Sequence, residues 1–371
     1  MSNIIINGLN SNSAGGKSVL TNFLYSLKHK PTNDNFIVLL TRREYEAELG
    51  DLPSNIKLVF VSSLFITPGL IFFTYFFLFR FLEVKFNADK VLSFGDLVPI
   101  CKCKLIYYFD WAYAVYPEHE IWNHMSFKSK LTRKVKMFQI QRFLPRATAT
   151  IAQTKVIKKR LEHLLSIKNV KVINNAVNRN IVGDYNDFHF PSGVKFLYLT
   201  RYYPHKNIDI LLDVANLIKK KGVNFKIILT ISAEQHINAK CFLNKVKEKA
   251  LDNIIVNIGE VEHRHISALY DQVDYLLMPS TLESFSGSYV EALQSNTPIL
   301  TSNLDFAHEV CGNAAFYFDE KKPTSIFETM VLSVSNINQL EEKIQEGARL
   351  FMKMDDWQDC SKKILDVICE E

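Results

Sequence analysis

Short runs of apolar residues recur along the whole chain, and segments with helical spacing separate them. In the first half the predicted strands are Asn3–Asn7, Phe36–Leu40, Lys57–Val61, Lys90–Phe94, Lys104–Phe109, Thr148–Ala152 and Lys171–Ile173. In the second half they are Val194–Thr200, Asn224–Thr230, Asn253–Asn257, Asp274–Met278, Thr297–Thr301 and Ala314–Phe318. Continuous apolar strands separated by helices are typical of parallel sheets that are covered on both faces. The pattern therefore predicts an α/β protein with doubly wound sheets.

The length of the chain and one polar stretch predict two domains. A chain of 371 residues is too long for one ordinary core, and the strand pattern restarts after a polar segment. We expect an N-terminal Rossmann-like domain over 1–177, a linker over 178–193, a C-terminal Rossmann-like domain over 194–352, and a last helix within 353–371 that packs back on the first domain. Because ligands of open α/β sheets bind beyond the carboxyl ends of the strands, the expected site is the cleft between the domains.

One helix is predicted in detail, over Lys206–Lys221. Its apolar residues fall on one face, and the lysines in its last turn match the negative end of the helix dipole. Gly222 follows directly and can supply the left-handed residue that often ends a helix.

The composition is that of a folded, globular protein, and the N-terminus leads us to expect that it stays in the cytoplasm. Hydrophobic residues make up 47% of the chain and charged residues 22%. The N-terminus lacks the basic and apolar regions of a signal peptide. The six cysteines are scattered, and Cys101 and Cys103 have no second pair at zinc-site spacing. We therefore expect reduced thiols rather than a disulfide framework.

A glycine pair follows the first predicted strand, within the stretch SNSAGGKS. The ATP-binding P-loop requires a glycine five positions before Gly16, where this chain has Ser11. The dinucleotide signature G-x-G-x-x-G is also absent. Gly15 and Gly16 still permit close backbone approach, and the free N–H groups at a helix start attract an anion. The alternative is a tight strand-to-helix turn without a ligand.

Two basic residues lie in the loop after the predicted strand Val194–Thr200. Arg201 and Lys206 are five positions apart. Such a pair can clamp a diphosphate, the arginine as a fork and the lysine as a point charge. The alternative is that these side chains serve solubility alone.

Two acidic residues follow the predicted strand Asp274–Met278. Glu283 lies in the loop, and Glu291 falls in the first turn of the next helix. The loop carboxylate can accept hydrogen bonds from sugar hydroxyls, and Glu291 can accept two from a ribose. The free amides near Gly287 and Ser288 can bind phosphate. For Glu291 alone, favourable charge at a helix start is an alternative explanation.

This combination of Gly15-Gly16, Arg201 with Lys206, and Glu283-x7-Glu291 resembles the retaining glycosyltransferases of group 1 (family 4), which have the GT-B fold. Further similarity runs through Lys171–Val177, Ile258-Gly259 and Thr297–Asp319. The resemblance implies two Rossmann-like domains that face a central cleft. It also implies a hexosyltransferase that moves a sugar from a nucleotide-diphosphate sugar to a glycan or lipid-linked acceptor, in surface polysaccharide biosynthesis such as O-antigen, lipopolysaccharide or capsule.

The resemblance also implies a role for each matching residue. Arg201 and Lys206 neutralise the leaving diphosphate, and Glu291 binds the ribose. Gly15 and Gly16 approach the sugar diphosphate from the opposite wall. The residues that hold the donor's sugar and phosphates are Glu283, Phe285, Ser286, Gly287 and Ser288. Such enzymes work without a metal or another cofactor, because two cations and a helix start replace a magnesium ion.

The chain departs from the family pattern at two places. The family's Glu-Gly-Phe-Gly is Glu283-Ser284-Phe285-Ser286 here, so two flexible glycines are missing. The family's His-Asp after a strand of the first domain is Phe109-Asp110, so the histidine is missing too. We expect Asp110 to contact donor or acceptor; the alternative is a helix cap. The leaving phosphate can then accept the acceptor's proton, because no paired carboxylates flank a shared centre.

Two segments of the first domain suggest a membrane surface. Leu64–Arg80 is the most apolar segment, but from Gly69 to Phe79 it offers only about 11 residues before a charge, fewer than the roughly 20 that span a bilayer. It can lie at the surface or be a buried helix. Phe127–Arg146 has seven basic residues and no acidic one, with Leu131, Val135 and Phe138 among them. We expect peripheral attachment to the anionic inner face of the cytoplasmic membrane.

Other functions remain open from the sequence. A sugar-nucleotide 2-epimerase of the same fold would bind the same donor and need no acceptor. A non-catalytic, membrane-associated partner subunit would keep the motifs without the activity. A nucleic-acid partner is not expected, because the basic stretch has too few aromatic residues for a stacking platform.

Overall fold

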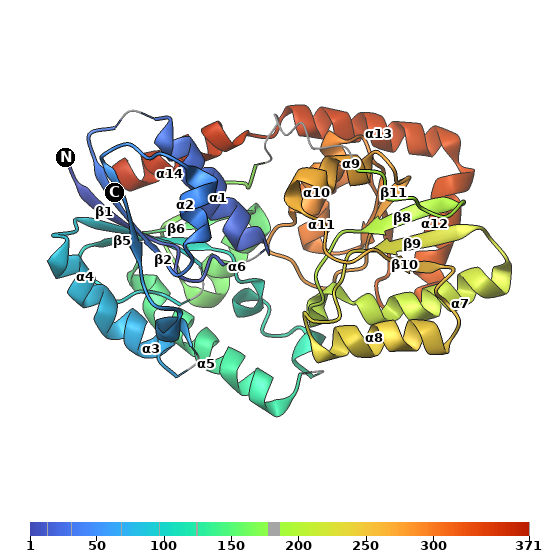
Figure 1. Ribbon diagram of the computed structural model, residues 1–371, viewed down its shortest axis with the longest axis horizontal. Coiled ribbons are helices and arrows are strands. Elements are labelled where there is room, and N and C mark those ends of the chain that lie inside the picture. The colour runs from blue at the N-terminus through green and yellow to red at the C-terminus, as the bar shows by residue number, and fades with distance from the viewer. Residues whose placement is uncertain are drawn as a thin grey trace. The chain divides into compact units, whose positions relative to one another are not determined.

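The computed structural model describes residues 1–12, 14–30, 32–67, 69–95, 97–123, 125–176 and 186–370. The chain forms two compact units (Figure 1). Unit 1 consists of Met1–Ala176 with Asp355–Glu371, and unit 2 of Val177–Met354. Of the expected linker, 178–193, the part from 178 to 185 lies outside the described residues.

Unit 1 is built on a seven-stranded parallel sheet. Its strands are β1 (Asn3–Asn7), β2 (Asn35–Leu40), β3 (Ile56–Phe60), β4 (Lys90–Phe94), β5 (Lys104–Phe109), β6 (Ala149–Ala152) and β7 (Val170–Val172). Their order in the sheet is β3-β2-β1-β4-β5-β6-β7, and all of the printed pairings are parallel. The central strands are almost wholly buried, which explains why their sequences lack an alternating polar face.

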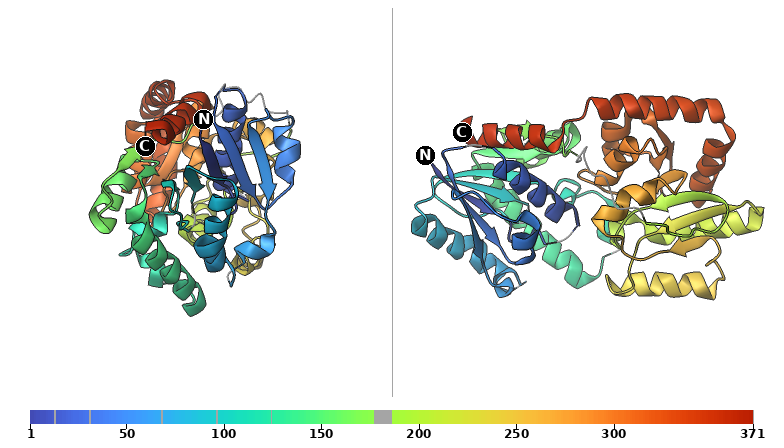
Figure 2. Two further views of the ribbon diagram at one scale, coloured as in Figure 1. Left: turned by 90° about the vertical axis from the view of Figure 1, so that its left-hand side faces the viewer. Right: turned by 45° about the horizontal axis from the view of Figure 1, so that its top comes forward.

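Helices cover this sheet. They are α1 (Ala14–Lys28), α2 (Glu44–Leu49), α3 (Ile71–Phe73), a π-helical turn (Thr74–Leu78), α4 (Phe79–Lys85), α5 (Phe127–Phe143), α6 (Lys155–Leu165) and α14 (Trp357–Glu370). Short 3-10 turns lie at Ser63–Ile66, Ala112–Val115, Glu120–Asn123 and Leu144–Arg146. The last helix, α14, packs beside α1 (Figure 2). Its buried residues, Trp357 and Ile364 among them, belong to the core of unit 1.

Unit 2 is built on a six-stranded parallel sheet. Its strands are β8 (Val194–Tyr198), β9 (Phe225–Leu229), β10 (Ile255–Asn257), β11 (Tyr275–Met278), β12 (Ile299–Ser302) and β13 (Ala315–Phe318), in the order β10-β9-β8-β11-β12-β13. The helices are α7 (Leu211–Lys221), α8 (Ile237–Glu248), α9 (Ile266–Tyr270), α10 (Gly287–Gln294), α11 (Asp305–Cys311), α12 (Pro323–Ser335) and α13 (Ile337–Met352). Short 3-10 turns lie at Pro204–Lys206, Ile208–Ile210, His263–His265 and Gly312–Ala314.

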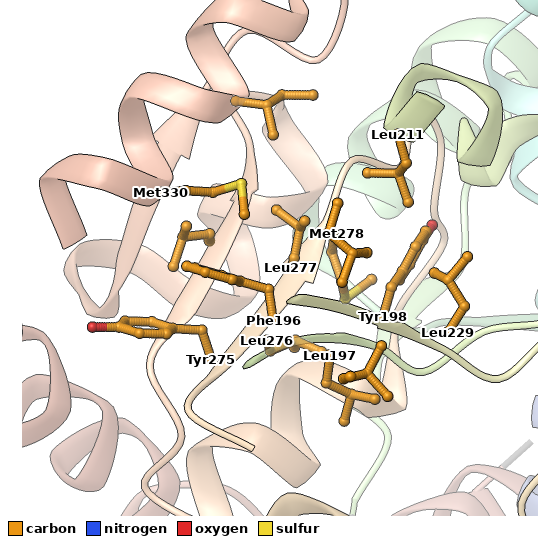
Figure 3. Packing of buried hydrophobic residues seen from close by; sticks show 14 of the residues in the cluster. Phe196, Leu197, Tyr198, Leu211, Leu229, Tyr275, Leu276, Leu277, Met278 and Met330 are labelled. Carbon is orange, nitrogen blue, oxygen red and sulfur yellow. The ribbon is translucent and has the colours of Figure 1, made fainter. Parts of the chain in front are cut away.

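The core of unit 2 surrounds its two central strands. Side chains of β8 and β11 pack against those of neighbouring helices, as Figure 3 shows for Phe196, Tyr275 and Met330. The rings of Phe196 and Tyr275 stack with their centres 4.9 Å apart. Because this core fixes both strands, it also fixes where the loops that follow them begin.

The predicted strands are confirmed, each within two residues of its predicted ends. The predicted start of the helix Lys206–Lys221 is wrong, because regular α-helix begins only at Leu211. Asn207 has a left-handed backbone with φ +53°, and its side-chain amide donates to the carbonyl of Glu320 at 2.8 Å. This contact turns the chain before the helix can start. The predicted end is confirmed, because Gly222 is left-handed with φ +65°.

Candidate functional site

The loops after β8, β9, β10 and β11 lie at one edge of the sheet of unit 2, because parallel strands end on the same side. Arg201 and Lys206 follow β8, whereas Glu283 follows β11. Since β8 and β11 are hydrogen-bonded neighbours, the sheet brings these residues close together, although they are far apart in the sequence.

Lys206 and Glu283 form the most buried ion pair of this edge. The Nζ of Lys206 lies 2.6 Å from Oε1 of Glu283, and the side chains are only 16% and 8% exposed. The buried hydroxyl of Tyr198 donates to the carbonyl of Lys206 at 2.7 Å and lies 2.9 Å from the hydroxyl of Ser280. Burial, followed by the nearby Glu283 carboxylate, raises the pKa of Tyr198 well above its ordinary value. The tyrosine therefore stays protonated and holds the two loops together.

Arg201 pairs with a residue that sequence reasoning missed. Its guanidinium lies 3.0 Å from Oε1 of Glu260, and the same oxygen accepts from the side-chain amide of Gln235 at 2.7 Å. Gln235 in turn accepts from the backbone N–H of Tyr202 at 2.8 Å. Arg201, Gln235 and Glu260 line an open pocket of about 600 Å³, which is bordered by the loops after β8, β9 and β10 and by Leu243 of α8. The only sequence signal for Glu260 was its place directly after Ile258-Gly259.

The start of α10 brings the remaining donor-side residues together. Gly287 is the first residue of the helix, and Ser286 before it has extended backbone and no side-chain cap. The amides that a cap would satisfy are thus available to an anion. Ser286 is buried, and Phe285 packs against the core of unit 2. The carbonyl of Ser288 accepts from the hydroxyl of Tyr270 at 3.1 Å.

Glu291 lies one turn into α10, in the same region. One of its oxygens accepts a long hydrogen bond of 3.4 Å from the hydroxyl of Tyr270. Burial raises the pKa of Glu291 to about 7, although the Tyr270 hydrogen bond lowers it. This carboxyl group therefore lacks the strong partner that its charged form requires, and a ligand with two hydroxyl groups could provide one.

Gly15 and Gly16 belong to unit 1, in the first turn of α1. A Cβ atom at Gly15 would meet nothing within 4 Å, and one at Gly16 would meet only Ser11 Cα, at 3.9 Å. Packing within unit 1 therefore does not explain these glycines. The neighbouring Lys17 forms an ion pair with Glu48, so its charge is already neutralised.

Asp110 follows β5 at the corresponding edge of the sheet of unit 1. Its carboxylate lies against Gly95, which follows β4 and has φ +62°; a Cβ there would lie 2.3 Å from Oδ1 of Asp110. Only glycine fits this position, for steric and backbone reasons alike. No spacing in the sequence predicts this contact, because it arises from β4 and β5 being neighbours in the sheet.

The structure thus brings Arg201, Lys206, Glu283 and the residues of α10 to one edge of unit 2, while Gly15, Gly16 and Asp110 lie in unit 1. Within the described ranges, no group of three or more histidine, cysteine, aspartate or glutamate side chains could hold a metal ion.

Comparison with known proteins identifies the second unit. The sequence profile of the family described as "Glycosyl transferases group 1" matches residues 188–367. This part of the chain belongs to the group 1 glycosyl transferases. It includes every residue that unit 2 contributes to the site.

Two relatives are 30% identical to this chain over the aligned residues. The first is the O-antigen chain mannosyltransferase RfbU of Salmonella typhimurium, and its alignment spans 155 residues, which are 40% of each chain. The second is the capsular polysaccharide biosynthesis glycosyltransferase CapH of Staphylococcus aureus, and its alignment spans 178 residues, which are 43% of this chain and 49% of CapH. The chain spans about half the length of the curated relatives that it matches.

A solved structure agrees with the fold over the whole chain. The Anabaena protein Alr3699/HepE, in complex with UDP and glucose, matches with a TM-score of 0.72, 15% identity and coverage of 100% of both chains. At this identity the likeness shows the fold alone. Together with the parallel sheets of both units, it shows that the chain has the GT-B fold.

The pKa of Glu291 predicts a pH-dependent effect on stability. In the folded protein the carboxyl group keeps its proton up to a pH of about 7, because its pKa is raised. In the unfolded chain the group loses the proton near its ordinary pKa of 4.5. The free energy of unfolding therefore falls as the pH rises through this window. Glu291→Gln removes this loss, so the variant should gain up to about 3 kcal/mol over the natural protein between pH 5 and 7.5.

Denaturant unfolding at several pH values measures this difference. Glu328→Gln, which changes an exposed glutamate of α12, serves as the control and should follow the natural protein. A difference between Glu291→Gln and the natural protein that does not change with pH would contradict the prediction.

Proposed function

We propose that the protein is a retaining hexosyltransferase that transfers a sugar from a nucleotide-diphosphate sugar to a glycan or lipid-linked acceptor in surface polysaccharide biosynthesis. The group 1 domain and the names of its O-antigen and capsule relatives support this proposal. The observation that carries it is the edge of unit 2 where Arg201, Lys206 and the start of α10 converge. Two cations and free amides there suit the diphosphate of a sugar nucleotide.

The diphosphate is the group for which this edge is best suited. Arg201 can bind it as a fork and Lys206 as a point charge, while the amides of Gly287 and Ser288 add partial positive charge. These groups neutralise the charge that develops on the phosphate as the sugar leaves. Neither a metal nor another cofactor is then needed. The ribose is bound by Glu291, whose carboxyl lacks a strong partner in the free protein.

The transferred sugar contacts the carboxylate of Glu283. Its carboxylate is held in place by Lys206, so its second oxygen can accept a hydrogen bond from a sugar hydroxyl. Phe285 and Ser286 continue this wall. Because serines replace both glycines of the family motif, side chains rather than bare backbone border the sugar here.

The transfer occurs on one face of the sugar. The bond from C1 to the phosphate oxygen breaks, a bond from C1 to the acceptor oxygen forms, and the acceptor's proton goes to the leaving phosphate. The configuration at C1 is thereby retained. In unit 1, we propose that Asp110 contacts the acceptor, and that the backbone at Gly15 and Gly16 approaches the phosphates.

Substitution of the two central residues tests this function. Glu283→Gln and Arg201→Ala should each lower kcat by about a hundredfold or more, because each removes a group that contacts the reacting sugar or phosphate. The assay offers UDP-, GDP- and dTDP-sugars with a membrane fraction that carries lipid-linked acceptors, and measures release of nucleoside diphosphate.

Arg264→Ala is the matched control, because Arg264 is exposed and pairs with Glu262 instead. Normal transfer by either Glu283→Gln or Arg201→Ala would refute the proposed roles. An epimerised sugar nucleotide without transfer would indicate the 2-epimerase, and no binding of any sugar nucleotide would indicate a non-catalytic partner subunit.

We also propose that unit 1 attaches the enzyme to an anionic membrane surface. Phe73, Phe77 and Phe81 are four residues apart on the helical segment of α3 and α4, and all three are at least half exposed. They form an apolar stripe on unit 1, within or just beyond the expected segment Leu64–Arg80. A second stripe lies on α5, which occupies most of the expected segment Phe127–Arg146.

The second stripe, on α5, combines apolar and basic side chains. Phe127, Leu131, Val135 and Phe138 are exposed along this helix. The two helical segments contact each other, because Phe76 packs edge-on against Phe143 with ring centres 5.2 Å apart. Lysines and arginines between these apolar residues suit anionic headgroups. Among the described residues, no helix is long and apolar enough to cross a membrane.

Vesicle flotation tests this attachment. The protein should float with vesicles that contain anionic lipid at low salt, should float less with neutral vesicles, and should be released at high salt. Phe77→Asp with Phe138→Asp should reduce flotation at least tenfold, because charges replace both stripes. Met352→Asp, at an exposed apolar residue of unit 2, is the control. A protein that never floats with anionic vesicles would refute the proposal.

A further inference from the structure

The pocket beside Arg201 contains polar groups that the transfer itself does not use. Oε1 of Glu260 accepts from both Arg201 and Gln235. Within the part of the chain that the structure describes, nothing donates to Oε2 of Glu260. The pocket, of about 600 Å³, is also lined by Asn257 and Ile231. It has the size of a site for a small organic ligand.

The orientation of Gln235 in this pocket is fixed. Its Oε1 accepts from the backbone N–H of Tyr202 at 2.8 Å, so its NH2 group must point toward Glu260. Tyr202 is itself anchored, because its hydroxyl donates to Asp209 at 2.5 Å. One N–H of the amide donates to Glu260, and the second is available to a ligand. The pocket thus offers a carboxylate acceptor beside a fixed N–H donor.

The ion pair of Glu260 changes when a donor binds, if the proposed function holds. A diphosphate carries more charge than one carboxylate and matches the fork of Arg201, so it competes for this arginine. Glu260 then loses its cationic partner and needs other donors. The base of the same nucleotide is the part of the ligand that can supply neutral N–H groups beside the phosphate site.

We propose that Glu260 and Gln235 select the base of the sugar-nucleotide donor, and that this base is guanine. The edge of guanine has two adjacent N–H donors, at N1 and N2, beside the acceptor O6. Glu260 accepts from both donors, and the free N–H of Gln235 donates to O6. This inference rests on the proposed function and names the donor class within it.

The other common bases match this pair less well. Uracil and thymine have one N–H between two carbonyl oxygens, so one of these oxygens faces the carboxylate. Adenine places the unprotonated N1 there. Each mismatch sets a lone pair against the charge of Glu260, and such a repulsive contact is an effective source of specificity.

Equilibrium titration with GDP and UDP tests the inference. The natural protein should bind GDP at least tenfold more tightly than UDP. Glu260→Gln offers one acceptor and one donor, which match N3–H and O4 of uracil, so this variant should lose the preference for GDP or reverse it. Glu262→Gln makes the same change of charge two residues away, where the side chain pairs with Arg264, and should keep the preference. Thermal unfolding establishes that each variant is folded.

The possible outcomes separate this inference from the proposed function. Tighter binding of UDP or dTDP than of GDP by the natural protein would overturn the choice of guanine and leave the glycosyltransferase proposal intact. Equal strengthening of GDP and UDP binding in Glu260→Gln would show that Glu260 is only a counter-ion for Arg201. Failure of the natural protein to bind any nucleoside diphosphate would overturn both proposals.

Discussion

The buried pair of Lys206 and Glu283 is the interaction on which the candidate site depends. It joins the loops after β8 and β11, and the side chains of both partners are largely buried. A buried ion pair adds little to stability, because both charges lose their hydration. Its value here is position, since it holds a cation and a carboxylate at fixed places on the edge of the sheet. Removal of either partner would leave an uncompensated charge.

Both cations at this edge are paired with carboxylates of the same unit. Lys206 is held by Glu283 and Arg201 by Glu260. The two pairs differ in burial, because the side chains of the Arg201 pair are 38% and 51% exposed. An exposed pair is weak and easily exchanged, whereas a buried pair persists. A diphosphate is therefore expected to displace Glu260 from Arg201 and to leave the Lys206 pair in place.

The sequence predicted the strands well, because each buried strand is an uninterrupted apolar run that helical segments separate from the next. It also predicted which residues follow the strands, and hence Arg201, Lys206, Glu283 and Glu291. It failed where a contact with a residue far along the chain accompanies the local structure, as the hydrogen bond from the Asn207 side chain to the backbone carbonyl of Glu320 does. Contacts such as Glu260 with Arg201 follow from which strands are neighbours, and no spacing in the sequence specifies them.

A crystal structure of the protein with a bound nucleoside diphosphate tests the central claim most directly. The account predicts that the phosphates contact Arg201, Lys206 and the first amides of α10, and that the ribose hydroxyls contact Glu291. Phosphates bound elsewhere, with Arg201 still paired to Glu260 and Glu291 without a ligand, would contradict it.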